Sequence, residues 1–202
     1  MEVNATLVRE LRDKTGAGIM DCKRALAETG GDLNNAISYL RQKGLAAAAK
    51  KADRVAADGA VGAYVHPGGK IGVLVEINCE TDFVARTTEF QSLLKDIAMQ
   101  IAAANPRYVR REDVSTDEIE NEREIYHRQG VESGKPEKVI EKIVDGKMER
   151  FFSEVCLLEQ AFIKDPDHKV ADIVNDVVAR LKEKIEVRRF VRYQLGEGVQ
   201  KE

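Results

Sequence analysis

The sequence predicts an α+β fold, in which a small N-terminal helical bundle precedes a sheet packed with helices. The spacing of the apolar residues supports this fold class because it changes along the chain. It is helical through residues 1–55, alternates as in a strand after Gly59, and is helical again near Phe90. A late alternating segment at residues 185–195 supplies a further strand. We therefore expect two domains: helices and a linker in residues 1–55, and an α+β core in residues 56–202.

The N-terminal domain is expected to contain three short helices. Their apolar stripes are Leu7–Leu11, Ile19–Leu26 and Leu33–Leu40, separated by the glycine-containing breaks Thr15–Gly18 and Gly30–Asp32. Helices joined by turns this short pack into a small bundle. The alanine-rich stretch at residues 45–51 is expected to form a helical linker to the core.

Two alternating segments around a turn predict a β-hairpin after Gly59. Val61–Val65 and Ile71–Ile77 alternate, and His66–Lys70 between them has the composition of a turn. An isolated hairpin is only marginally stable, so we expect the late strand to pair with it. In that strand, one face is expected to hold Ile185, Val187, Arg189, Val191 and Tyr193, and the other Arg188, Phe190 and Arg192.

A helical hairpin is expected at about residues 112–152. Ser115–Glu118 fits a capping box, Gly134–Pro136 breaks the helical pattern, and helical spacing resumes from Ile140 to Val155. One further helix is expected on each side of this hairpin: from Phe90 to Ile101 and, after a break at Lys164–Asp167, from Val170 to Leu181.

Charge and hydropathy argue against several classes of partner. The 202 residues include 32 Lys and Arg against 35 Asp and Glu, a net charge of −3, whereas proteins that bind phosphate backbones are usually basic. Direct binding to nucleic acid is therefore not expected. The sequence has no apolar run of membrane-spanning length and no apolar signal segment at its start, so we expect a cytoplasmic protein without a membrane partner.

Little in the sequence resembles a catalytic site. Cys22, Cys79 and Cys156 are too widely spaced for a zinc site or a disulfide framework. A thiol nucleophile formed by Cys79 and His66 across the hairpin is conceivable and stays open as an alternative. We expect no enzyme activity, no resident metal and no cofactor.

The start of the second helix is the first candidate binding segment. Ile19 can belong to the apolar stripe of that helix, whereas Met20 lies about 100° away from the stripe. Met20 is therefore expected to be partly exposed, near the cation of Arg12. Such a methionine suits adaptable contact with an apolar helix groove, but it could equally be half-buried at the edge of the bundle.

The junction after the second strand is the other candidate. Thr81 or Asp82 is expected to cap the helix that follows. Phe83 lies seven residues before Phe90, so it could extend the core stripe of that helix. Alternatively, it could project from the junction as an exposed aromatic side chain.

Three segments closely resemble the motifs of the bacterial elongation factor Ts family. They are Leu11–Leu26 with its Thr-Gly-Ala-Gly-Ile-Met sequence, Glu76–Arg86 with Thr-Asp-Phe-Val, and Val187–Tyr193 followed by Gly196–Gly198. The resemblance extends over almost the whole chain. It implies an N-terminal domain of the three-helix UBA-like kind, a three-stranded antiparallel sheet packed with helices, and a helical hairpin corresponding to the coiled-coil excursion of the family.

The resemblance also implies guanine-nucleotide exchange on elongation factor Tu, the GTPase that delivers aminoacyl-tRNA during translation elongation. Arg12, Ile19 and Met20 would dock on a helix of the nucleotide-binding domain; Ile19 replaces a methionine that is common in the family. The residues Thr81, Asp82, Phe83 and Val84 would intrude near the bound Mg²⁺ and phosphates, with Phe83 as the inserted side chain, and so promote GDP release.

The chain has room for one sheet-and-helix core module, and short family members of this kind pair through their sheets. The resemblance therefore implies a homodimer. The alternative function is a UBA-like adaptor for a different protein partner, which would have no need of the Thr-Asp-Phe-Val segment.

Overall fold

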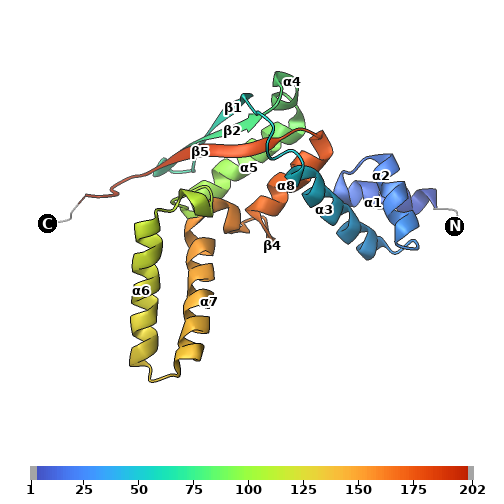
Figure 1. The fold of residues 1–202 in the computed structure, drawn as a ribbon. Helices are drawn as coiled ribbons and strands as arrows, with labels where there is room; N and C mark the ends of the chain where they lie inside the picture. The colour runs from blue at the N-terminus through green and yellow to red at the C-terminus, as the bar shows by residue number, and fades with distance from the viewer. Residues whose placement is uncertain (1–3, 200–202) are drawn as a thin grey trace. The chain divides into compact units, whose positions relative to one another are not determined.

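The computed structural model describes residues 4–199 and is a mixed α+β structure (Figure 1). Residues 1–3 and 200–202 of the two predicted domains lie outside this range. The chain divides into two compact units. Within the described residues, one contains residues 4–61 with Glu76–Leu94 and Asp172–Val187, and the other contains Gly62–Val75, Lys95–Ala171 and residues 188–199. The predicted boundary after residue 55 stays a prediction.

The three N-terminal helices form as predicted. They are α1 (Ala5–Thr15), α2 (Ile19–Glu28) and α3 (Leu33–Ala49), so α3 extends into the alanine-rich stretch. Asn4 and Asp32 cap α1 and α3 with side-chain oxygens that accept backbone N–H groups. The buried residues they share are Leu11, Cys22, Ala25, Leu26 and Ala36.

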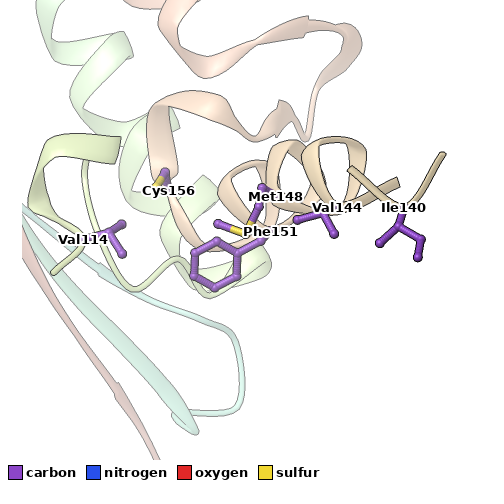
Figure 2. Packing of buried hydrophobic residues seen from close by; sticks show 6 residues of the cluster. All are labelled: Val114, Ile140, Val144, Met148, Phe151 and Cys156. Atoms are coloured by element: carbon purple, nitrogen blue, oxygen red, sulfur yellow. The ribbon is translucent and has the colours of Figure 1, made fainter. Parts of the chain in front are cut away.

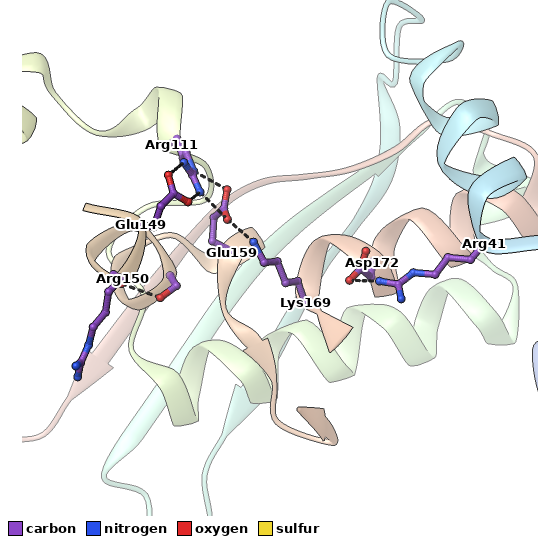
Figure 3. Close-up of polar contacts among 8 residues, drawn as sticks. Arg41, Arg111, Glu149, Arg150, Glu159, Lys169 and Asp172 are labelled. Carbon is purple, nitrogen blue, oxygen red and sulfur yellow. Dashed lines mark hydrogen bonds and ion pairs between the residues drawn. The ribbon is translucent and has the colours of Figure 1, made fainter. Parts of the chain in front are cut away.

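Helix α3 also packs against α8 (Val170–Leu181) within the first unit. Arg41 of α3 forms an ion pair with Asp172 (Figure 3). Gly44 lies so close to α8 that an added Cβ would come within 3.2 Å of the Ala179 side chain. The absence of a side chain at residue 44 therefore allows the two helices to approach closely.

The predicted hairpin and late strand form one antiparallel sheet. Its strands are β1 (Asp58–Val65), β2 (Ile71–Cys79) and β5 (Ile185–Gln194), in the order β1-β2-β5. The His66 N–H donates to the Ile71 carbonyl across the turn, at 2.9 Å. Gly59 has φ of +138°, and an added Cβ would lie 2.2 Å from the Ile77 carbonyl oxygen, so only glycine fits there.

The predicted faces of the late strand stay a prediction, but burial along it ends at Val187. Ile185 and Val187 are buried as expected, but Val191 and Tyr193 are exposed. The alternation changes phase at two consecutive exposed residues, Arg188 and Arg189.

Phe190 and Arg192 are the partly buried residues of β5 after Arg189. The Arg192 guanidinium donates to the Ala102 carbonyl of α5 (Thr88–Ala104), at 3.3 and 3.4 Å. Both residues belong to the second unit. The second half of β5 therefore presents apolar side chains, Val191 and Tyr193, to solvent.

The helical hairpin is confirmed, with α6 (Thr116–Glu132) and α7 (Glu137–Val155) side by side (Figure 1). Ser115 caps α6, since its hydroxyl accepts the Glu118 N–H at 3.3 Å. The Glu118 carboxylate instead binds Arg107 and Tyr108, so the predicted capping box is formed only in part. The buried cluster of the hairpin contains Val114, Ile140, Val144, Met148, Phe151 and Cys156 (Figure 2).

A small two-stranded sheet lies where only a break was predicted. It consists of β3 (Ala161–Phe162) and β4 (Asp165–Lys169) and precedes α8. The strands are too short and too polar to show alternation. Buried amides fix them, because Gln100 donates to Gln160 at 3.1 Å and accepts from the Ile163 N–H at 2.8 Å. Within residues 4–199, every helix is too short or too polar to span a bilayer.

Arg111 joins the base of the hairpin to the segment after it (Figure 3). Its guanidinium binds both carboxylate oxygens of Glu149 on α7, at 2.6 and 2.8 Å, and both of Glu159, at 2.7 and 3.1 Å. Lys169 donates to Glu159 at 2.9 Å. The hydrogen bonds from Arg111, then those from Lys169, lower the pKa of Glu159 to about 2.

This shift predicts that the second unit loses stability in acid. A carboxyl group whose pKa is lowered by folding contributes stability above its ordinary value of 4.5, and the contribution disappears as the pH falls toward about 2. Glu159→Gln should therefore reduce the free energy of unfolding near neutral pH by about 2–3 kcal/mol. Between neutral pH and pH about 3, the free energy of unfolding should fall by a smaller amount in this variant than in the parent.

Urea unfolding at the two pH values measures this difference. Glu154→Gln is the matched control, because Glu154 binds Arg150 on the exposed surface of α7, where 61% of the Glu154 side chain is accessible. An equal pH dependence in Glu159→Gln and the parent would contradict the assignment.

Candidate partner-binding site

The candidate site is the corner at residues 80–86, where β2 ends and the four-residue helix α4 (Asp82–Ala85) follows. Thr81 is the N-cap of α4, as predicted. Its backbone is extended, with φ of −135° and ψ of 153°, and its hydroxyl oxygen accepts the Val84 N–H at 3.4 Å. The chain therefore turns from strand to helix within two residues.

Glu183, which is distant from Thr81 in the sequence, holds Thr81 in place through two hydrogen bonds. The Thr81 N–H donates to one Glu183 carboxylate oxygen at 3.0 Å, and the Thr81 hydroxyl donates to the other at 2.7 Å. Hydrogen bonds to an ionised acceptor are stronger than neutral ones. This contact spans 102 residues of sequence.

Glu80 makes the reciprocal contact. The Lys184 N–H donates to the Glu80 carboxylate at 2.6 Å, and the Arg54 guanidinium donates to both of its oxygens at 3.3 Å. The hydrogen bond from the Lys184 backbone is the main reason why the pKa of Glu80 is lowered. Two carboxylates thus join residues 80–81 to residues 183–184: Glu183 accepts hydrogen bonds from the first segment, and Glu80 accepts one from the second.

The C-terminal end of α4 is anchored separately. The Thr87 hydroxyl donates to the Val84 carbonyl at 2.8 Å, and it accepts the Phe90 N–H of α5 at 3.3 Å. Gln91 donates to the Ala85 carbonyl at 2.7 Å. A four-residue helix has too few internal hydrogen bonds to persist alone, so these contacts hold it in place.

Phe83 projects from this anchored corner. Its side chain is 77% exposed, whereas Ala85 on the same short helix is 6% exposed. The interpretation of Phe83 as part of the core stripe is therefore wrong. Asp82 lies beside it and forms an exposed ion pair with Arg86 at 2.8 Å. The corner thus presents a large aromatic ring next to an accessible carboxylate.

The N-terminal candidate residues are also exposed. Ile19 is 54% and Met20 68% exposed, and Arg12 is exposed as well. The alternative of a half-buried Met20 is wrong, and so is the placement of Ile19 in the core stripe. Ile19 is the first residue of α2, and helical side chains lean toward the N-terminus, so no earlier turn of α2 covers its side chain.

The loop before α2 is held by local hydrogen bonds. The Thr15 hydroxyl donates to the Leu11 carbonyl at 2.7 Å and accepts the Ala17 N–H at 3.3 Å. Gly16 ends α1 with φ of +66°, a left-handed conformation that favours glycine. These contacts fix the start of α2, from which Ile19 and Met20 project.

Cys79 has a structural role at the corner. Its thiol is buried and donates to the Thr81 carbonyl at 3.1 Å. Burial, assisted by the nearby Glu183 charge, raises the pKa of Cys79 to about 11. The His66 ring instead contacts the Tyr64 hydroxyl at 3.1 Å. These surroundings oppose the thiolate that a cysteine nucleophile requires.

Comparison with known proteins identifies the family. The family model described as Elongation factor TS matches residues 24–197. The chain belongs to the elongation factor Ts family. The similar proteins named Elongation factor Ts include that of Desulforamulus reducens, which is 62% identical over 99% of this chain and 92% of its own length. Those of Heliobacterium modesticaldum and Geobacter metallireducens are each 60% identical, over 98% and 100% of this chain and 93% of their own lengths.

Family membership confirms the resemblance and gives the chain a role as a translation elongation factor. It also confirms the α+β class with its three-stranded antiparallel sheet. The UBA-like classification of the N-terminal helices stays a prediction. The roles of the candidate residues in binding a partner are likewise proposals.

The residues that hold the corner were not found from the sequence. Glu183 and Arg54 are ordinary charged residues in segments without a distinguishing motif, and Glu80 lies inside the Glu76–Arg86 motif but was not singled out there. Only the pairing of β2 with β5 brings Glu183 to Thr81. A test for charged residues at the ends of paired strands would have found them once that pairing was known.

The surroundings of the thiols predict low reactivity in this elongation factor Ts family member. Cys22, Cys79 and Cys156 are all buried, and burial is the largest cause that raises each pKa. At pH about 8, only about one thiol in a thousand is ionised when the pKa is near 11. We expect Ellman's reagent to label none of the three in the folded protein and all three in denaturant. Rapid labelling of Cys79 in the folded protein would contradict this account.

Proposed function

We propose that this chain is the guanine-nucleotide exchange factor for elongation factor Tu and promotes GDP release during translation elongation. The observation that carries the proposal is the exposure of Phe83 on an anchored corner, within a family whose members are named Elongation factor Ts. An aromatic side chain that is 77% exposed in the free chain is available for burial in a partner. Burying a phenylalanine contributes roughly 1.5–3 kcal/mol.

In this proposal Phe83 inserts between helices of the GTPase near its bound Mg²⁺, with Thr81, Asp82 and Val84 forming the rest of the intruding segment. Mg²⁺ bridges the nucleotide phosphates and requires nearly ideal octahedral geometry. Displacing the residues that support that geometry therefore raises the rate of nucleotide release. The corner is already fixed in the free chain, so little conformational entropy is lost when it inserts.

Asp82 is free to take part in this contact. Its ion pair with Arg86 is exposed, with 77% of the Arg86 side chain accessible, and such pairs contribute only about 0–1 kcal/mol. Breaking the pair upon binding therefore costs little. Asp82 can then accept a hydrogen bond from the partner or repel a carboxylate near its Mg²⁺.

The exposed residues at the end of α1 and the start of α2 provide the second contact. Arg12, Ile19 and Met20 would dock on a helix of the nucleotide-binding domain, where the flexible methionine adapts to an apolar groove. Docking at α2 contributes affinity, whereas insertion at the corner changes the nucleotide site. Both are needed for exchange at low concentrations of the factor.

Thermodynamic linkage sets what the factor must do. The factor must bind nucleotide-free GTPase more tightly than it binds the GDP complex. Bound GDP must then lower the affinity of the GTPase for the factor by the same ratio by which the factor lowers its affinity for GDP. A segment that bound the GDP complex and the nucleotide-free GTPase equally well would not change the affinity for GDP. No bond is made or broken, so the proposed role requires neither a catalytic residue nor a cofactor of this chain.

Release of fluorescent GDP from elongation factor Tu tests the proposal. We expect Phe83→Ala to fold normally and to lower the maximal rate of release by about tenfold or more, equivalent to about 1.4 kcal/mol or more of lost insertion energy. Phe83→Leu should lie between Ala and the parent because it keeps part of the apolar volume. Release by Phe83→Ala at the parental rate would contradict the insertion.

Met20→Ala is the comparison variant for that assay. Its exposed side chain is removed from the docking contact and not from the corner. We expect it to raise the concentration of factor needed for half-maximal release while leaving the maximal rate within about twofold. Capture of a protein other than elongation factor Tu from a bacterial lysate, without acceleration of GDP release, would favour the adaptor alternative.

We also propose that two copies pair through their sheets, as the family resemblance implies. The second unit leaves apolar side chains of β1, β2 and β5 exposed: Ala63, Val65, Leu74, Val191 and Tyr193. Exposed apolar side chains gathered on one sheet are typical of a protein–protein contact. Pairing would remove this surface from water.

Light scattering tests the pairing. Leu74→Lys places a charge on β2 at a side chain that is 48% exposed, so it should leave the fold intact but oppose association through repulsion across the symmetric interface. We expect the parent to have the mass of a dimer and the variant that of a monomer. Leu45→Lys on α3, where Leu45 is 41% exposed, is the control and should stay dimeric. A monomeric parent would contradict the proposed homodimer.

A further inference from the structure

Glu183 lies outside the sequence motifs of the family resemblance, yet its carboxylate holds the corner that carries Phe83. We propose that Glu183 is a positioning residue for nucleotide exchange, which sets the direction of Phe83 through its two hydrogen bonds to Thr81. This inference rests on the proposed exchange function. It assigns to Glu183 a role in the activity that is separable from folding.

The geometry at Thr81 links Glu183 to the exposed ring. The Thr81 hydroxyl donates its proton to Glu183 at 2.7 Å, which leaves its oxygen free to accept the Val84 N–H at 3.4 Å. One hydroxyl therefore connects the carboxylate to the first turn of α4. Phe83 is only two residues from Thr81, so rotation or displacement of Thr81 moves the ring directly.

The backbone around Glu183 is itself constrained. Lys182 follows α8 in the left-handed region, with φ of +61°, and its N–H donates to the Val178 carbonyl at 2.9 Å. A non-glycine residue in that conformation is held there by its surroundings. Ile185 begins β5 and is buried. Glu183 is thus fixed between the end of a helix and the start of a strand.

The opposing contact of Glu80 with Lys184 does not replace this role. It joins the same two segments, but it acts one residue before the cap of α4. Without Glu183, the segments would remain attached through Glu80, while the Thr81 N–H and hydroxyl would lose their acceptor. We therefore expect a displaced corner rather than an unfolded chain.

Loss of position should lower the rate because insertion depends on geometry. A displacement of about 1 Å from a productive arrangement can reduce a rate by about a hundredfold. Glu183→Ala should therefore lower the maximal rate of GDP release from elongation factor Tu by about ten- to a hundredfold. The concentration for half-maximal release should change by less than about threefold, because the docking residues on α1 and α2 are untouched.

Two variants make the test specific. Glu183→Gln should retain most of the activity, since its amide oxygen can accept the Thr81 N–H and its NH₂ group can donate to the Thr81 hydroxyl oxygen. Glu186→Ala is the matched control on the same segment, because Glu186 pairs with the Lys184 side chain at 3.3 Å and, among the described residues, its side chain forms no hydrogen bond or ion pair with residues 80–86. It should release GDP at the parental rate.

A double-mutant cycle decides whether Glu183 acts through Phe83. In the Phe83→Ala background, Glu183→Ala should cause little further loss, because the ring that it positions is absent. An equal loss in both backgrounds would overturn the positioning role. If Phe83→Ala alone released GDP at the parental rate, the proposed function itself would fail. If Phe83→Ala were slow and a folded Glu183→Ala fast, only the positioning role would fail.

Amide hydrogen exchange provides a readout that needs no partner. The Thr81 amide should lose protection in Glu183→Ala and regain it in Glu183→Gln, while amides in the core of α5 stay protected. Unchanged protection of Thr81 in Glu183→Ala would overturn the inference. Should Glu183→Ala fail to fold, Glu183→Asp replaces it, because the shorter side chain keeps the charge but cannot hold both contacts in place.

Discussion

The candidate site depends on hydrogen bonds between residues that are about a hundred positions apart. Glu183 accepts from Thr81, and Glu80 accepts from the Lys184 backbone, so each segment supplies a carboxylate to the N–H groups of the other. These bonds matter because α4 is too short to be stable by itself. They allow Phe83 to remain outside the core although its burial would contribute roughly 1.5–3 kcal/mol to folding. That free energy is then available in a complex.

The strongly periodic parts of the fold could be predicted from the sequence. The three N-terminal helices, the β-hairpin, the helical hairpin and the late strand all formed close to their expected residues. The features that could not be predicted are those in which contacts distant in sequence, and not the local spacing of apolar residues, decide the structure. Burial along β5 ends at Val187, so Val191 and Tyr193 are exposed although their spacing continues that of Ile185 and Val187. The short β3–β4 pair depends on buried Gln100, whose role appears only in three dimensions.

The exposure of Phe83 and Ile19 shows why spacing alone could not settle the site. A separation of seven residues would place Phe83 and Phe90 on one face only if a single helix continued between them. The chain instead ends α4 at Ala85 and starts α5 at Thr88, with Thr87 bonded to both, so the helical phase is not carried across. Ile19 has the core spacing of α2 but lies at its first position, where no preceding turn covers it.

Helix α8 gives the two proposed contact regions a common support. Near its start, Asp172 pairs with Arg41 of α3, and farther along Ala179 lies against Gly44. Just beyond its end, Lys182 turns the chain so that Glu183 reaches Thr81. Energetic coupling between sites requires a contiguous set of packed or hydrogen-bonded groups. Within the first unit, α8 provides such a set, because it contacts α3, which packs against the helix that carries Met20, and it leads into the residue that anchors Phe83. We therefore expect a displacement of α8 to affect both the proposed docking and the proposed insertion, and loss of the Glu183 carboxylate to affect the proposed insertion alone.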